Sequence, residues 1–70
     1  MKPKHYQKTP EPIEVIEGWG LDFHLGNVVK YISRWQEKGG LEDLQKALWY
    51  LDRKIKLEEK DENRNDKIRY

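Results

Sequence analysis

Two adjacent glycines separate two helical patterns in the middle of the chain. Before Gly39 and Gly40, apolar residues recur at spacings of three and four, the period of one helix face. After them, apolar residues alternate at spacings of three and four, as in a coiled-coil seam. Glycine readily takes the left-handed conformation that ends a helix, so the sequence predicts an antiparallel helical hairpin with a turn at Lys38-Gly39-Gly40. The first face is Leu25, Val28, Val29 and Ile32, and the seam is Leu41, Leu44, Leu48, Leu51 and Ile55.

A shorter helix is predicted just before the hairpin. Pro12 suits a first helical position, because its missing N–H would have no partner there, and Gly18 and Gly20 end the segment. About two turns of helix are too short to be stable alone. The helix must therefore pack on the hairpin, with Trp19 as the expected anchor.

The hairpin helices have recognisable ends. Asp22 is a predicted N-cap, since its carboxylate can accept a hydrogen bond from an exposed N–H group. The helix that follows should run from about Phe23 to about Glu37, and the next should begin near Leu41. Gly26, inside the first of these helices, costs about 1 kcal/mol relative to alanine and suggests a close approach by a neighbour.

The expected fold is all-α, with a short N-terminal helix docked on an antiparallel helical hairpin. The helical domain should span residues 12–57. An extended arm, residues 1–11, precedes it, because proline fixes φ and disfavours helix in the residue before it. Residues 58–70 form a tail of mixed charge, which should be a solvated helix end or disordered.

The chain is small for an independent fold. A core of this size contributes roughly 3–5 kcal/mol, and the 70 residues include no cysteine for a stabilising disulfide. Three tryptophans, four tyrosines and one phenylalanine exceed what a hairpin and a two-turn helix can cover. We expect a homo-oligomer whose interface includes part of the seam, which packs on the preceding helix, on another subunit, or on both.

Composition excludes several classes of protein. The net charge of +1 lacks the positive field of a general nucleic-acid binder, and no P-loop motif occurs. No apolar run is long enough for a membrane span, and the N-terminus has no signal-peptide pattern, so a cytoplasmic location is expected.

No metal site is predicted. Mg²⁺ could accompany phosphates at Asp22, Asp43 or Asp52, although cap, first-turn charge and surface ion pair explain these three residues equally well.

A polar stripe with one aromatic residue follows the other face of the first hairpin helix. Its cations lie one turn apart, roughly 6 Å, a spacing suited to a di- or triphosphate. Tyr31, Trp35 or Trp49 could stack on a base. The alternative is a solvated face whose cations pair with acidic residues of the next helix. The stripe consists of Asn27, Lys30, Tyr31, Arg34 and Lys38.

The N-terminal arm carries an aromatic, hydrogen-bonding pair, His5 and Tyr6. These residues either belong to a disordered terminus or fold over a site on the hairpin.

The order of several short motifs resembles the SaV-like family of phage and prophage proteins, a domain of unknown function. The resemblance covers about residues 5–54 and rests on HYQ, WGLDF, LGN, KYI, RW, KGG, DL, KA and WYLDR. A phage nucleoside-monophosphate kinase that lacks a P-loop contains this domain and is oligomeric, but that kinase is longer than this chain. The resemblance therefore implies nucleotide binding, with or without phosphoryl transfer, in a host cell cytoplasm. The stripe residues and His5 and Tyr6 lie within the matching motifs, and their chemistry leads us to expect that they bind the nucleotide.

Three functions remain open from the sequence. The first is a phage-derived nucleotide-binding protein that is kinase-like or sequesters nucleotides. In this hypothesis Lys30, Arg34 and Lys38 hold phosphates, and Arg34→Ala abolishes binding in a folded protein. The second is a module that binds a host protein through Tyr31, Trp35 and Trp49. The third is a small DNA-binding helical regulator, against which the near-neutral charge argues.

Overall fold

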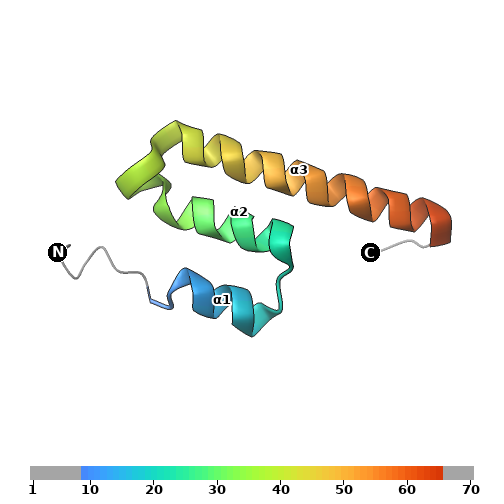
Figure 1. Cartoon of the computed structure of the whole chain (residues 1–70), viewed down its shortest axis with the longest axis horizontal. Helices are drawn as coiled ribbons and strands as arrows, with labels where there is room; N and C mark the ends of the chain where they lie inside the picture. Colours follow the sequence, from blue (N-terminus) through green and yellow to red (C-terminus); the bar gives the residue numbers. More distant parts are fainter. Residues whose placement is uncertain (1–8, 66–70) are drawn as a thin grey trace.

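The structure, a computed structural model, describes residues 9–65, with side chains described to Asp61. Helix α1 (Pro12–Trp19) is followed by α2 (Phe23–Arg34), a π-helical segment (Trp35–Gly39) and α3 (Gly40–Asn65). Figure 1 shows α2 between α1 and α3, with neighbouring helices running in opposite directions. Residues 9–65 contain no strand. The fold is therefore all-α, with a short helix packed on a helical hairpin, and the extents of 50 × 26 × 18 Å describe a thin layer.

Helix α1 begins and ends as its sequence predicts. Glu11 and Glu14 form a capping box, in which Glu14 Oε1 accepts from the Glu11 N–H at 3.0 Å, so two N–H groups that lack helical partners are satisfied. At the other end Gly20 has φ 65° and ψ 39°, and its N–H donates to the Glu17 carbonyl. This left-handed residue ends the helix.

The contact between α1 and α2 is made by an isoleucine and a glycine. Gly26 is buried, and a Cβ added to it would lie 3.4 Å from Ile16 Cγ2. A neighbour does approach this glycine, as its place in the helix suggests, but at a distance that an alanine Cβ could also meet in van der Waals contact. The prediction that Trp19 anchors α1 is wrong, because 72% of Trp19 is exposed and Ile16 makes the contact instead.

The hairpin turn differs in detail from the prediction. The Asp22 N-cap is confirmed, since its Oδ1 accepts from the Leu25 N–H at 2.9 Å. However, the α-helix stops at Arg34, short of the predicted Glu37, and widens into a π-helix. The Gly40 N–H then donates to the Trp35 carbonyl, and Gly40 takes φ 58° and ψ −145°, a conformation largely restricted to glycine.

Two ion pairs and one aromatic stack join α2 to α3. At the turn, Arg34 Nε donates to Asp43 Oδ2 at 2.9 Å. At the open end, Lys54 Nζ lies 2.7 Å from Asp22 Oδ2. Between them the rings of Tyr31 and Tyr50 stack, with centroids 6.0 Å apart and planes at 15°. The predicted antiparallel hairpin is confirmed by these contacts.

The surface of α3 that faces α2 is not the leucine seam. Asp43 (1% exposed) and Ala47 (6%) are buried there, and Tyr50 and Lys54 contact α2. These residues recur at spacings of four and three, but on a different side of the helix. The expectation that the seam could pack on α2 is therefore wrong for Leu48, which is 65% exposed.

The layer consequently has two unlike faces. With 3.6 residues per turn, the seam lies more than a quarter turn round α3 from the residues that face α2. On α2, the apolar residues are rotated about the helix axis in the same direction, away from Tyr31 and Arg34, which face α3. Because α2 and α3 are antiparallel, these rotations bring both sets of apolar residues to the same side of the layer. We call this side the apolar face; it comprises Leu25, Val28, Val29 and Ile32 with the seam residues Leu41, Leu44, Leu48, Leu51 and Ile55.

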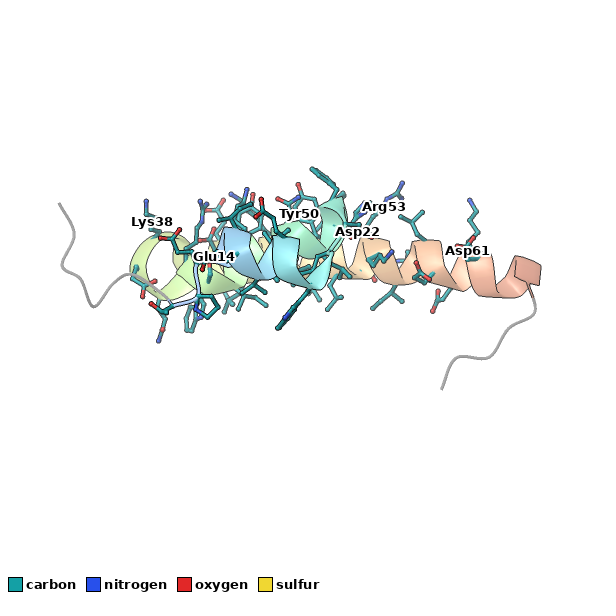
Figure 2. All side chains as sticks on the ribbon, turned by 90° about the horizontal axis from the view of Figure 1, so that it is seen from below. Glu14, Asp22, Lys38, Tyr50, Arg53 and Asp61 are labelled. Carbon is teal, nitrogen blue, oxygen red and sulfur yellow. The ribbon has the colours of Figure 1, made fainter. Side chains whose placement is uncertain are left out.

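The opposite side carries cations and aromatic rings, and we call it the polar face. Figure 2 views the layer edge-on, and Lys38, Tyr50 and Arg53 project to the same side of it. The polar face comprises Lys30, Tyr31, Arg34, Lys46, Trp49, Tyr50 and Arg53.

Helix α3 extends well past the hairpin, to Asn65 (Figure 1). Two i,i+4 ion pairs lie along it, Lys54–Glu58 at 2.8 Å and Lys56–Asp52 at 2.6 Å. Such pairs support an exposed helix by a few tenths of a kcal/mol each. The first part of the charged tail is thus a solvated helix end.

Substitution of the turn glycine tests the account of the hairpin. Gly40→Ala should lower the free energy of unfolding by about 1–3 kcal/mol, because alanine is strained at the positive φ of this residue. Urea unfolding followed by tryptophan fluorescence measures the loss. Gly18→Ala is the matched control: nothing lies within 4 Å of its added Cβ, so that variant should be as stable as the parent or more so. Equal stability of the two variants would contradict the role given to Gly40.

Candidate functional site

Three cations surround one tyrosine ring on the polar face. Lys30 Nζ lies 4.5 Å from the centroid of Tyr31. The guanidinium carbon of Arg34 lies 5.0 Å from that centroid, and Lys46 Nζ lies 5.5 Å from it. Two of the cations come from α2 and the third from α3, so the site exists only in the folded hairpin. These distances are those of cation–π interactions.

An aromatic floor continues from Tyr31 onto α3. Tyr50 stacks on Tyr31, and Trp49 meets Tyr50 edge to face with centroids 5.0 Å apart. Tyr31, Lys46, Trp49 and Tyr50 line a hollow of about 340 Å³. Trp49 is 61% exposed, so its ring is available to a ligand.

The Arg34 side chain is largely taken up by its ion pair with Asp43, which stabilises the fold. Besides the bond from Nε, its Nη2 donates to Asp43 Oδ1 at 3.3 Å, which makes the pair bidentate. The hydrogen bond from Arg34 lowers the pKa of Asp43 below its ordinary value of 3.8, with further contributions from the charges of Arg34 and Lys46 and from the Gly39 backbone. The same hydrogen bond raises the pKa of Arg34. The alternative interpretation of the stripe, ion pairing with the next helix, thus holds for Arg34.

Because of the Arg34–Asp43 pair, substitution of Arg34 is not a clean test of the site. Removal of Arg34 would leave the Asp43 carboxylate buried without its partner, which is strongly destabilising. The expectation that Arg34→Ala leaves a folded protein is therefore not supported by the structure. Lys30 and Lys46 are better probes, since within residues 9–61 neither side chain forms an ion pair.

The remaining residues of the predicted site lie apart from the three cations. The Asn27 side chain donates to the Phe23 carbonyl at 2.9 Å, so its amide is tied to its own helix. Lys38 is exposed in the π-helical segment, on the same side of the layer as Tyr50. His5 and Tyr6 lie outside the described residues. Of the predicted set, the structure brings together Lys30, Tyr31 and Arg34.

Two residues of the site escaped the sequence analysis. Lys46 and Tyr50 lie on α3, whereas the predicted stripe was confined to one helix. Asp43 offered a usable signal: it can face Arg34 across the turn, and Lys46 and Tyr50 follow it by three and seven residues. Alignment of α3 on α2 through that ion pair would have placed Lys46 and Tyr50 near Tyr31.

Each aspartate considered for Mg²⁺ has a cationic partner. Asp22 pairs with Lys54, which by its hydrogen bond lowers the pKa of Asp22; Asp43 pairs with Arg34 and Asp52 with Lys56. Over residues 9–65, no three His, Cys, Asp or Glu side chains gather as a metal site would require. Within the same range, no helix combines the length and apolar character needed to cross a bilayer.

Fold and site together define a small helical-hairpin protein with a cation-ringed aromatic hollow. The chain belongs to the family described as protein of unknown function, DUF3310, whose model matches residues 1–52. That range includes α1, α2, the turn and the part of α3 that carries Lys46, Trp49 and Tyr50. No curated protein and no solved structure matches the chain.

Acid unfolding tests the buried ion pair. The folded-state pKa of Asp43 is lowered, so its contribution to stability is present above the unfolded value near 3.8 and is lost as pH falls through the folded pKa. The free energy of unfolding should therefore decline below about pH 4. In Asp43→Asn the free energy of unfolding should fall less steeply with pH, because this variant lacks the carboxylate that takes up as much as one proton on unfolding.

Urea unfolding at a series of pH values from 2 to 7 measures this slope. Asp52→Asn serves as the control, because the Asp52–Lys56 pair is exposed on both sides and contributes little. If Asp43→Asn kept the pH slope of the parent, the Arg34–Asp43 pair would not control acid stability.

Proposed function

We propose that the polar face binds nucleotides. The observation that carries the proposal is the ring of three cations around Tyr31, beside a hollow of about 340 Å³ with aromatic walls. A nucleotide combines a flat apolar base with a polyanion, and this surface offers a counterpart for each. Its volume is at the lower end of the range for small-molecule sites.

Each part of the site has a distinct role in this proposal. The ammonium groups of Lys30 and Lys46 approach the Tyr31 ring from different helices and hold the phosphates. The exposed Trp49 ring stacks on the base, an interaction that tolerates any base. Arg34, held by Asp43, keeps Tyr31 in place and adds positive charge.

The proposal extends to the kind of nucleotide-binding protein. The motifs quoted above support membership of the SaV-like phage and prophage group, with a relationship to a phage nucleoside-monophosphate kinase. Binding alone would suffice for a protein that sequesters nucleotides, and Mg²⁺ would enter with the phosphates. His5, Tyr6, Asn27 and Lys38 stay in the proposed site as residues that could close over a ligand or extend its phosphate contacts.

A second candidate is supported by the same surface. Trp49 and Phe23 expose 61% and 70% of their area, and aromatic residues are enriched in protein interfaces. A host protein could therefore bind the polar face. A DNA-binding regulator has weaker support, since the net charge is only +1.

A thermal-shift screen with mono-, di-, tri- and cyclic nucleotides tests the primary proposal, because a ligand of the native state raises the unfolding temperature. Calorimetry then measures the affinity of the best ligand. Lys46→Ala should weaken it about tenfold or more, the effect of losing one charged hydrogen bond.

Lys56→Ala is the matched control. Lys56 lies on the same helix in an exposed pair with Asp52, away from Tyr31, so its removal should leave the affinity unchanged. Absence of any shift, together with capture of a host protein that Trp49→Ala abolishes, would favour the second candidate. Oligonucleotide binding that weakens steeply with salt would favour the third.

A further inference from the structure

Large apolar side chains on the apolar face of the layer are exposed in the part of the chain that the structure describes. Leu41 is 68% exposed and Leu48 65%. Among residues 9–61 the one apolar side chain counted as buried is Ala47, at 6%. A single layer of helices cannot enclose a core, since stable domains pack at least two layers. The face therefore requires a second layer.

We propose that this second layer is another copy of the same chain, whose α3 lies antiparallel on the α3 of the first, with Leu48 near the twofold axis. The seam is almost symmetric about Leu48: Leu41 and Ile55 lie seven residues on either side of it. In an antiparallel pair, Leu41 of one copy therefore meets Ile55 of the other at both ends. Such self-complementarity is what a twofold interface requires.

The surface beside Leu48 has the form of a coiled-coil hole. A hollow of about 310 Å³ is lined by Gln45, Leu48, Trp49 and Asp52. These residues are spaced i, i+3, i+4 and i+7, as are the four residues that receive a knob from a facing helix. Leu48 of the second copy enters this hole, and by symmetry the first copy's Leu48 enters the equivalent hole.

The open flank of the seam favours the antiparallel direction. In an antiparallel pair centred on Leu48, the end of this flank that carries Glu42 approaches the end that carries Lys56 of the second copy. In a parallel pair, the open flank of one α3 would instead face the flank of the other α3 that α2 already covers. The side of α3 that bears Asp43 and Lys54 is already occupied by α2, so only the flank with Glu42 and Lys56 is open.

The size of the face also fits a second copy. One whole side of the layer, 50 × 26 Å with α1 and the end of α3 included, is on the order of 1,000 Å², compared with about 800 Å² per partner in a stable interface. Two hairpins joined through these faces form a four-helix arrangement with a shared core. Tyr31, Lys46 and Tyr50 remain outside the pair, whereas Trp49 borders both the hollow at Tyr31 and the hole beside Leu48.

Disulfide trapping tests the direction of pairing, and the chain has no native cysteine to interfere. Leu41→Cys and Ile55→Cys variants are oxidised separately and then as an equal mixture. We expect a crosslinked dimer in the mixture, containing one chain of each variant, and little crosslinking of either variant alone. In an antiparallel pair, like positions at either end of the seam lie roughly 21 Å apart.

Strong crosslinking of each variant with itself would overturn the antiparallel arrangement. No crosslinking in any sample, combined with a monomeric mass, would overturn the assembly itself.

Light scattering after size exclusion tests whether the seam holds the copies together. The parent chain should have the mass of at least two chains at micromolar concentration, and Leu48→Glu should reduce it toward one. Leu57→Glu is the matched control, because Leu57 lies on the same helix outside the seam and should keep the parent mass. A monomeric parent, or a Leu48→Glu variant with unchanged mass, would refute the proposal. If Leu48→Glu is unfolded by circular dichroism, the disulfide experiment on the folded variants decides.

Discussion

The Arg34–Asp43 ion pair is the interaction on which the rest of the structure depends. Asp43 is almost completely buried, so its charge must be compensated where it lies. Arg34 supplies that compensation across the turn and thereby fixes the register of α3 on α2. The turn is shaped around the same carboxylate: a Cβ on Gly39 would overlap the Asp43 side chain, and Gly40 adopts a positive φ. Two glycines and one ion pair thus act as a unit.

The register set at the turn determines both faces of the layer. It places Tyr31 over Tyr50 and brings Lys46 toward the cations of α2, which creates the hollow on the polar face. It also turns the small and polar residues of α3 toward α2. The leucine seam is therefore left on the other side, where it is free to pair with another chain. One register accounts for the cation-ringed hollow on the polar face and for the exposed leucines on the apolar face.

Local signals predicted the elements well, because caps, glycines and apolar periods act within a few residues. The Asp22 cap, the Pro12 start and the all-α hairpin follow from such signals. The site was predicted only in part, since it depends on the pairing of helices. Lys30, Tyr31 and Arg34 share one helix and could be grouped by spacing. Lys46 and Tyr50 could be placed in the site only if the register of α3 on α2 was known. The buried Arg34–Asp43 pair fixes that register, whereas the spacing of apolar residues does not. The spacing of the leucines on α3 also led to the expectation that the seam could pack on α2. The face of α3 that packs on α2 instead consists of Asp43, Ala47, Tyr50 and Lys54.

The central claim is that one face of the layer assembles while the opposite face stays open. Isotope-filtered NMR on an equal mixture of labelled and unlabelled protein tests it most directly, because it detects only contacts between copies. The account predicts intermolecular contacts between the methyl groups of Leu41 and Ile55 and around Leu48, with none from the rings of Tyr31 or Tyr50. Intermolecular contacts to those tyrosine rings, or none to the seam, would contradict it.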